Sequence, residues 1–338
     1  RFSSVMGIKL LMLLLLISSM TMFMSGLGAN FEFDFKKIIA LSTLSQLGLM
    51  FTILSLGELN LAFFHLLIHA LFKALLFMCA GALIHSFNNI QDIRFMGSVI
   101  MFMPLTGCFF NVSNMALCGL PFLSGFYSKD IILEVMSSNM FNLYIYLIIY
   151  LSTGLTVSYS FRLMYYSVFS SLNLSTLSSL GDYNEIMLKG MAGLIIFVIL
   201  GGSLITWVVF PVPYFICLPL MLKYMVLLII LTGGYLGFMV SKFSVSSEIL
   251  ILNFMGPKYF LMFMWNMSVL TSMMLFYSVL NLGGGYYKNY DLGWLEYWGS
   301  QGLWQNFQNN SLSMMKIFVK NLNIFLILFV ILVFFCFL

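Results

Sequence analysis

The chain has 338 residues, of which 62% are hydrophobic and only 8% are charged, and its net charge is +4. Soluble domains carry about 25% charged residues, so this composition excludes a soluble globular protein and indicates an integral membrane protein. The long apolar runs do not alternate as the strands of a membrane barrel do. Because hydrocarbon offers no water to backbone groups, we expect helices, and therefore an all-α, polytopic transmembrane helix bundle.

Apolar runs long enough to span a bilayer follow one another from the first residues onward. The predicted spans are 6–27, 38–56, 61–84, 141–169, 187–210 and 215–240. The chain starts with an arginine and enters a span at once, so we interpret it as a piece of a longer protein whose beginning is missing. Its basic residues form no cluster, which argues against a nucleic-acid partner.

The region 99–140 is long enough for two passes, but it has no polar turn in its middle. It contains Gly119, Pro121 and Gly125 instead. Proline removes a backbone donor and glycine lowers helix propensity, so we predict one discontinuous helix, or two half-helices that meet at a break. Such breaks are tolerated at membrane depth where they line a cavity or are covered by protein.

The pattern changes after residue 242. The region 257–280 is apolar enough to span, and the three glycines at 283–285 are expected to break the chain. The region 303–318 is amphipathic, as in helices that lie along a membrane surface or on a partner. Its apolar face carries Leu303, Phe307, Ser311, Met314 and Phe318. The final apolar run, 323–338, is just long enough to span and would anchor the end of the chain.

Three ionisable residues share one stripe of the span 61–84. His65, His69 and Lys73 are spaced by four residues, and each such step advances about 40° around a helix. Ionisable groups at membrane depth usually mark an ion or proton route, with histidine as a relay. The alternative is that they only join neighbouring helices by hydrogen bonds. A zinc site is disfavoured, because the stripe lacks the glutamate of HExxH and a third ligand.

A second lysine, Lys129, follows the predicted break and precedes Asp130. A broken helix exposes backbone groups, so we expect carbonyls of the break to face Lys129 and water. Asp130 and Glu134 could then carry the proton out or stabilise the lysine. The alternative is that these are ordinary charges of an interfacial loop.

Other polar positions leave their roles open. Ser42, Ser45 and Gln46 form a stripe that fits helix packing or capping. Arg162 could snorkel to the interface or pair with a carboxylate. The five cysteines show no CxxC or Cys/His pairing and are interpreted as buried small hydrophobes.

Nucleotide and redox motifs are missing from the sequence. It has no P-loop, no GxGxxG after a strand, no cluster of four cysteines, and no histidine pair on separate spans that would suggest haem. We therefore predict no cofactor or metal site in this chain. Any driving energy would come from an ion gradient or from a partner.

Three stretches carry a resemblance to a known family. They read DFKKIIALSTLSQLG at 34–48, FHLLIHALFKALLF at 64–77 and LPFLSGFYSKD at 120–130. Together they resemble the antiporter-like, proton-pumping subunits of respiratory complex I, and among these the mitochondrial versions of insects. The abundant Phe and Met, 36 and 27 residues, fit an AT-rich organelle genome.

The resemblance implies two inverted helical repeats, each with a broken helix and a buried lysine, joined by a hydrophilic axis along the membrane plane. It implies that Lys73 is the central lysine of the second repeat and that His65 and His69 are its relay histidines. Lys36 would be a bridging lysine. Lys129, with Asp130, would be the terminal lysine at the exit path.

The resemblance also divides the chain. Residues 1–170 would be the second repeat, incomplete at its start, and 171–243 would hold additional transmembrane helices. Residues 244–319 would form a loop and a lateral amphipathic helix, so that 257–280 would be part of the lateral region and not a span. Residues 320–338 would be the C-terminal transmembrane helix. The first repeat, with its glutamate–lysine pair, should precede Arg1 and is absent from this sequence.

The expected function is proton translocation in the mitochondrial inner membrane, driven by electron transfer from NADH to ubiquinone elsewhere in complex I. FMN, iron–sulfur clusters and ubiquinone would belong to other parts of the complex. The expected partners are membrane-arm subunits, including homologous antiporter-like subunits under the lateral helix, and lipids. The alternatives are a subunit of a multisubunit sodium/proton antiporter and a structural scaffold without transport. In a scaffold, Lys73 and Lys129 would be paired and dry.

Overall fold

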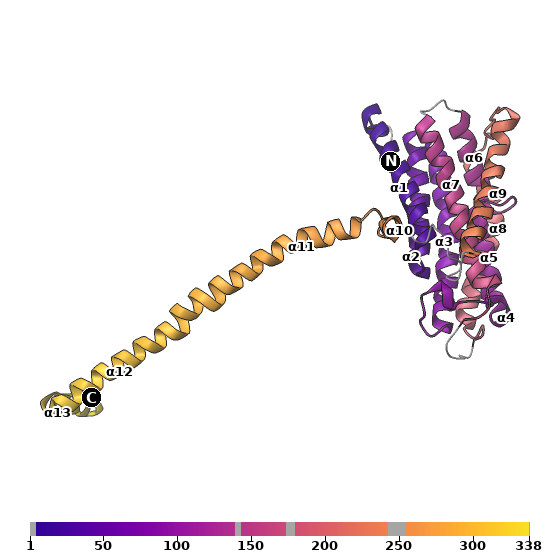
Figure 1. The fold of residues 1–338 in the computed structure, drawn as a ribbon. Coiled ribbons are helices and arrows are strands. Elements are labelled where there is room, and N and C mark those ends of the chain that lie inside the picture. Colours follow the sequence, from indigo (N-terminus) through magenta and orange to yellow (C-terminus); the bar gives the residue numbers. More distant parts are fainter. Residues whose placement is uncertain (1–4, 139–142, 174–179, 243–254, 338) are drawn as a thin grey trace. The chain divides into compact units, whose positions relative to one another are not determined.

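The computed structural model describes residues 5–138, 143–173, 180–242 and 255–337. Every regular element in these ranges is helical (Figure 1), which confirms the predicted all-α class. Seven of the described helices are long and apolar enough to cross a membrane. The chain divides into two compact units, 1–266 and 267–338, and each is described by itself.

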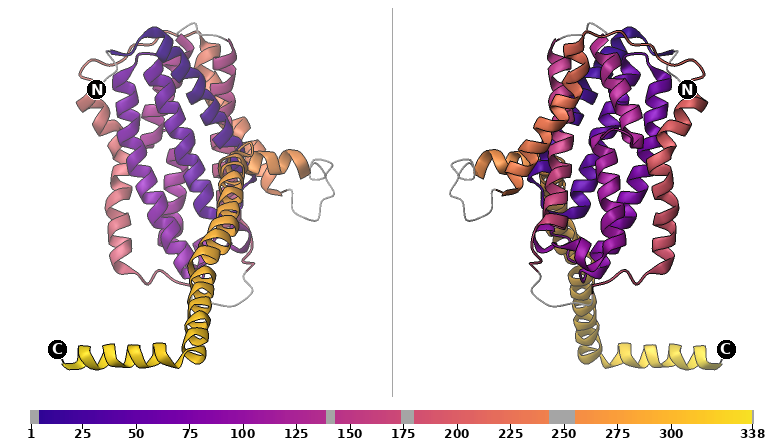
Figure 2. Two further views of the ribbon diagram at one scale, coloured as in Figure 1. Left: turned by 90° about the vertical axis from the view of Figure 1, so that its left-hand side faces the viewer. Right: turned by 90° about the vertical axis from the view of Figure 1, so that its right-hand side faces the viewer.

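The first unit is a bundle of long helices that lie side by side (Figure 2). Its α-helices are α1 (Ile8–Phe31), α2 (Phe35–Ser55), α3 (Leu59–Ser86), α4 (Val99–Phe102), α5 (Pro104–Cys118), α6 (Ser124–Ser138), α7 (Leu143–Met164), α8 (Glu185–Val209), α9 (Leu220–Lys242) and α10 (Met255–Met262). The predicted span 215–240 starts too early, because α9 begins only at Leu220. Pro219 disfavours a helical conformation in the residue before it, which delays the start of the helix.

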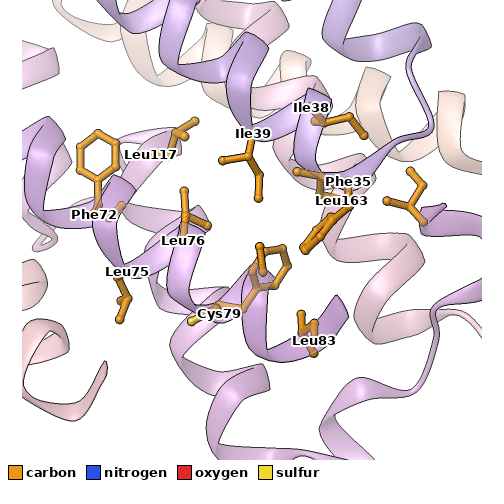
Figure 3. Packing of buried hydrophobic residues seen from close by; sticks show 14 of the residues in the cluster. Phe35, Ile38, Ile39, Phe72, Leu75, Leu76, Cys79, Leu83, Leu117 and Leu163 are labelled. Carbon is orange, nitrogen blue, oxygen red and sulfur yellow. The ribbon is translucent and has the colours of Figure 1, made fainter. Parts of the chain in front are cut away.

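The core of the bundle lies where α2, α3, α5 and α7 meet (Figure 3). The residues that Figure 3 labels there are Phe35, Ile38, Ile39, Phe72, Leu75, Leu76, Cys79, Leu83, Leu117 and Leu163. All of them are buried, whereas many apolar side chains on the outer faces of the same helices are exposed. Such an arrangement is expected of a bundle whose outer surface is solvated by lipid.

Small residues let several helix pairs approach closely, as is common between membrane helices. A Cβ atom added at Gly48 of α2 would lie 3.1 Å from the carbonyl oxygen of Ser18 in α1. One added at Gly233 or Gly237 of α9 would lie 2.6 or 2.3 Å from a carbonyl oxygen of α7. These glycines therefore fix the spacing of the helices that surround the core.

The structure confirms the predicted discontinuous helix. α5 ends at Cys118 and α6 begins at Ser124, and two residues of the intervening turn, Gly119 and Phe122, have positive φ angles of 82° and 71°. The two halves meet very closely. A Cβ atom at Gly125 would lie only 1.8 Å from the carbonyl oxygen of Ala116.

The second unit is almost entirely helical. It consists of α11 (Met267–Tyr286), two π-helical segments (Tyr287–Leu295 and Tyr297–Gln301), α12 (Gly302–Lys320) and α13 (Leu322–Phe337). The elements from Met267 to Val319 form one helix of 53 residues. The prediction of an amphipathic helix at 303–318 is confirmed as helix, within α12.

One prediction for this part of the chain is wrong. The glycines at 283–285 do not break the helix, since glycine costs roughly 1 kcal/mol in a helix but keeps the backbone N–H that proline lacks. For the region 257–280, which the composition alone would allow to span and the resemblance assigns to the lateral region, the structure has no single continuous helix. α10 ends at Met262, and three residues with positive φ, Met264, Trp265 and Asn266, separate it from α11.

Candidate functional site

Polar side chains from four helices line up inside the apolar bundle. We call this set the polar row. Its members are Ser42, Ser45 and Gln46 of α2, His65, His69 and Lys73 of α3, Ser128 and Lys129 of α6, and Thr156 and Tyr159 of α7. His69 is half-buried and every other member is buried. The local reason is helical spacing, which places four-residue repeats of α2 and α3 on the faces that these helices turn toward each other.

Lys73 lies at one end of the polar row with a side chain that is only 4% exposed. Its Nζ donates a hydrogen bond to the hydroxyl of Ser42. Across the described ranges no carboxylate forms an ion pair with it, and the ion pairs recorded there involve Lys37, Arg94 and Lys189 near the surface. A buried charge without a counter-ion is costly unless water or hydroxyl groups solvate it.

His65 lies in the middle of the polar row and connects two helices. Its Nδ1 is 2.9 Å from the hydroxyl of Ser128, and its Nε2 is 3.3 Å from Oε1 of Gln46. The ring of His69 follows at 6.3 Å between centroids. Nε2 of His69 is buried and has no hydrogen-bond partner among the residues that the structure describes. The stripe predicted from the sequence is therefore present, and His65 joins α3 to both α2 and α6.

Lys129 lies at the other end of the polar row and is also only 4% exposed. Its Nζ donates to Oγ1 of Thr156 over 2.9 Å, and this hydroxyl donates to the carbonyl of Thr153. The helix break lies against the aliphatic part of the Lys129 side chain. A Cβ atom added at Gly119 would lie 3.4 Å from Cδ of Lys129. The expectation that carbonyls of the break face the ammonium group is therefore wrong, because a threonine hydroxyl of α7 takes that place.

A small cavity of about 10 Å³, enough for the centre of one water molecule, adjoins Lys129. Half-buried Asp130 lines the same cavity together with residues of α9. The structure thus brings Asp130 next to the end of the polar row. Lys36, by contrast, is exposed at the start of α2 and lies outside the row.

Several members of the polar row were not predicted as site residues. Thr156 and Tyr159 belong to a hydroxyl-rich stretch, 152–160, within an otherwise apolar span, and this enrichment is a signal that sequence reasoning could have used. Tyr159 contacts Ser45 at 3.3 Å. Ser42 and Gln46, which fitted mere packing or capping in the sequence, are direct partners of Lys73 and His65.

Arg162 of α7 does not snorkel, and it forms no ion pair with a carboxylate of the described residues. It is buried, and its Nη1 donates to the carbonyls of Asn30 and Glu32 at 2.5 and 2.9 Å, with Ala29 at 3.4 Å. These carbonyls belong to the C-terminal end of α1, where a cation is favoured by the helix dipole. Burial raises the pKa of the nearby Glu32 carboxyl, while the positive charges of Lys37 and Arg162 oppose this shift. Arg162 is therefore a structural cap.

No group of three or more His, Cys, Asp or Glu side chains suited to a metal ion occurs within the described part of the chain. A separate cavity of about 250 Å³ lies at one end of the bundle between α3, α5 and α8 and is lined by His85 and Asp182. None of the members of the polar row lines it. The polar row is thus the candidate site, and it can accept, hold and pass protons between nitrogen and hydroxyl groups.

Comparison with known protein families gives two matches that cover nearly the whole chain. The family described as "NADH dehydrogenase subunit 5 C-terminus" matches residues 159–338. The family described as "NADH:quinone oxidoreductase/Mrp antiporter, TM" matches residues 1–157.

Two insect proteins, both NADH-ubiquinone oxidoreductase chain 5, are similar to this chain. The identity is 52% to that of Locusta migratoria and 51% to that of Anopheles quadrimaculatus, over 94% and 93% of this chain. The matches cover 55% and 54% of the two relatives, so the chain spans about half the length of the curated relatives it matches.

Solved structures share this fold. One of them is a chain of the membrane-bound sulfane sulfur reductase, an archaeal respiratory membrane complex. The TM-score is 0.51 at 21% identity, and the likeness covers 69% of this chain and 45% of that chain.

Proposed function

The chain belongs to the NADH dehydrogenase subunit 5 family, and on this basis we propose that it is a proton-translocating membrane subunit of respiratory complex I, NADH:ubiquinone oxidoreductase. The observation that carries the proposal is the polar row. Two lysines, each 4% exposed, are solvated by hydroxyl groups inside an apolar bundle, and a histidine with a partner on each ring nitrogen lies between them. Ionisable groups in that environment are characteristic of proton pathways.

In this proposal Lys73 and Lys129 each gain and lose a proton during turnover, and His65 and His69 relay protons between them. Asp130 receives the proton beyond Lys129. Serine and threonine hydroxyls suit this role because they both donate and accept hydrogen bonds. Lys36, exposed in this chain, would connect the polar row with a neighbouring subunit.

The redox reaction takes place elsewhere in the proposed complex. FMN, iron–sulfur clusters and ubiquinone belong to other parts of it, and this chain contributes a translocating unit without a redox centre. Residues 1–170 act as the second antiporter-like repeat, 171–243 as additional spans, 244–319 as the lateral region and 320–338 as the terminal anchor. The partners are membrane-arm subunits, including homologous antiporter-like ones, and lipids, and the location is the mitochondrial inner membrane.

A sodium/proton antiporter subunit is the second candidate, because the family that matches residues 1–157 includes Mrp antiporters. The match of residues 159–338 to the subunit 5 family favours complex I. A scaffold without transport is disfavoured by the lack of any ion pair to Lys73 or Lys129 among the described residues.

The test is a Lys73→Met variant in an assembled complex I reconstituted into vesicles. We expect fewer protons pumped per NADH oxidised, because methionine cannot carry the proton. Lys73→Arg should also fail, since arginine stays protonated. Lys189→Met is the matched control, because this lysine is exposed and its ion pair, with Glu185, is exposed as well. Full pumping by an assembled Lys73→Met complex would contradict the proposal.

A further inference from the structure

His65 has one hydrogen-bond partner at each ring nitrogen, and the two partners come from different helices. Ser128 of α6 lies at Nδ1 and Gln46 of α2 lies at Nε2. A neutral imidazole carries a single N–H, so one ring nitrogen donates and the other accepts. The two partners must therefore play opposite roles at any moment.

Ser128 can take either role. Its hydroxyl is 2.9 Å from Nδ1 of His65 and 3.3 Å from the carbonyl oxygen of Gly125. The single hydroxyl hydrogen goes to one of these acceptors at a time. When it goes to Gly125, the serine oxygen is free to accept from Nδ1–H.

Gln46 can take either role as well. Its Oε1 is 3.3 Å from Nε2 of His65, and its amide nitrogen is buried without a hydrogen-bond partner in the part of the chain that the structure describes. The hydroxyl of Tyr159 lies beside this amide, and because a hydroxyl can both donate and accept, it is compatible with either orientation of the amide group. A half-turn of the amide group would present the NH₂ to His65 in place of the oxygen.

Two consistent arrangements follow. In the first, His65 donates from Nε2 to the Gln46 oxygen, and Ser128 donates to Nδ1. In the second, the Gln46 amide donates to Nε2, His65 donates from Nδ1 to Ser128, and Ser128 donates to Gly125. A mixture of the two leaves lone pairs facing each other in a buried site, which is unfavourable because a buried acceptor then lacks a donor.

We propose that Gln46 is a positioning residue that sets the tautomer of His65 and thereby gates proton passage between the Lys129 end and the Lys73 end of the polar row. This inference rests on the proposed function of the chain. It adds Gln46, whose amide group does not itself transfer a proton but determines when His65 can transfer one.

A proton that moves toward Lys129 starts from the second arrangement. A half-turn of the Gln46 amide brings its oxygen to the bare Nε2 of His65, and protonated His69 gives a proton from its Nε2 through water to that nitrogen. The imidazolium then releases its Nδ1 proton to Ser128, while Ser128 gives its own hydroxyl proton through water to neutral Lys129. His65 is left neutral with its proton on Nε2, donating to the Gln46 oxygen, and Ser128 donates to Nδ1, which is the first arrangement.

The experiment compares Gln46→Met, Gln46→Glu and Thr52→Val in the assembled complex I. Thr52 is the matched control, since it is buried on the same helix and donates only within that helix, to Leu49. We expect Gln46→Met to lose the same share of the proton yield per NADH that Lys73→Met loses, at every pH. Gln46→Glu should regain that share as the pH is lowered, because a protonated carboxyl restores one donor and one acceptor. Thr52→Val should pump normally.

If Gln46→Met does not assemble, Ser128→Ala tests the same arrangement, and it should lose the same share of proton yield. Normal pumping by Gln46→Met or by Ser128→Ala would overturn the gate. Loss in Gln46→Glu without any recovery at low pH would also overturn it, since a packing role predicts no such pH dependence. If Lys73→Met loses pumping while Gln46→Met keeps it, the proposed role of Gln46 is wrong and the proposed function stands. If both keep it, the proposed function fails.

Discussion

Hydroxyl groups are the partners of both buried lysines. Ser42 accepts from Lys73 and Thr156 accepts from Lys129, and each hydroxyl in turn donates to a carbonyl of its own helix. A carboxylate would fix the ammonium form through a strong ion pair. A hydroxyl solvates the charged and the neutral amine comparably, because it can both accept and donate. The choice of partner therefore suits lysines that change protonation state.

Arg162 is also a buried cation, but its role is structural. Replacing it by leucine should lower the free energy of unfolding by about 2–5 kcal/mol, because several buried carbonyls at the end of α1 lose their donor. The measurement is the thermal unfolding temperature of the assembled complex.

Arg94→Leu is the control for this prediction. Arg94 also lies over the ring of Phe33. Its Cζ is 4.3 Å from the ring centroid, and the Cζ of Arg162 is 4.9 Å from it. The ion pair of Arg94 with Asp92, however, is exposed. Its loss should cost at most about 1 kcal/mol. Equal effects of the two variants would show that stacking on Phe33, and not the capping of α1, gives Arg162 its importance.

At the scale of elements, the break between α5 and α6 sets the position of Lys129. The backbone turns at Gly119, and α6 then approaches α5 so closely that only hydrogen fits at Gly125. This contact fixes the start of α6, and the next turn of the helix carries Ser128 and Lys129 toward α3 and α7. The geometry of the break thus connects the glycines to the polar row.

Gly125→Ala should prevent the closure of this junction, because the new Cβ would lie 1.8 Å from a backbone oxygen that cannot move independently. We expect a loss of at least about 3 kcal/mol, in the range of severe steric and backbone effects, seen as a failure of the chain to assemble. Gly193→Ala is the matched control in α8, since nothing lies within 4 Å of its added Cβ. Assembly of Gly125→Ala at the level of Gly193→Ala would refute the close junction.

At the scale of the whole molecule, the two units differ in how they are stabilised. The bundle buries a core, whereas none of the residues described in α11, α12 or α13 has its side chain buried within this chain. Large apolar side chains such as Phe307, which is 72% exposed, remain uncovered on α12. A helix of this kind gains its stability from what covers its apolar face. In the proposed complex, neighbouring homologous subunits would cover α12, which would then act as a strap between them.

Ending the chain before residue 303 should therefore loosen the association of the complex more than it changes the polar row. Native electrophoresis in detergents of increasing strength would measure this. Ending the chain after residue 320 removes only α13 and separates the strap from the terminal anchor. An experimental map in which 303–318 touches only its own chain, or crosses the bilayer, would rule out the strap.

The fold could be predicted wherever the signal is local in sequence. Apolar runs placed most spans, and Gly119, Pro121 and Gly125 placed the break. The same kind of local signal gave a wrong prediction at 283–285, where the helix tolerates three glycines. At 257–280 composition alone allows a span, because composition does not report the turn at Met264–Asn266. Local propensity ranks conformations but does not decide between them when the difference is small.

By itself the sequence determined that His65, His69 and Lys73 share a stripe and that Lys129 follows a helix break. Both conclusions depend on single segments, because the 3.6-residue period of a helix and a charge within an apolar run can be recognised without knowing the neighbouring helices. Only the tertiary structure decided which groups face them. Ser128 reaches His65 from 63 residues away, Thr156 reaches Lys129, and Arg162 caps α1, while Lys36 stays outside the row. Periodicity defines the face of a helix. The packing of one helix against another determines what that face meets and how deeply it is buried.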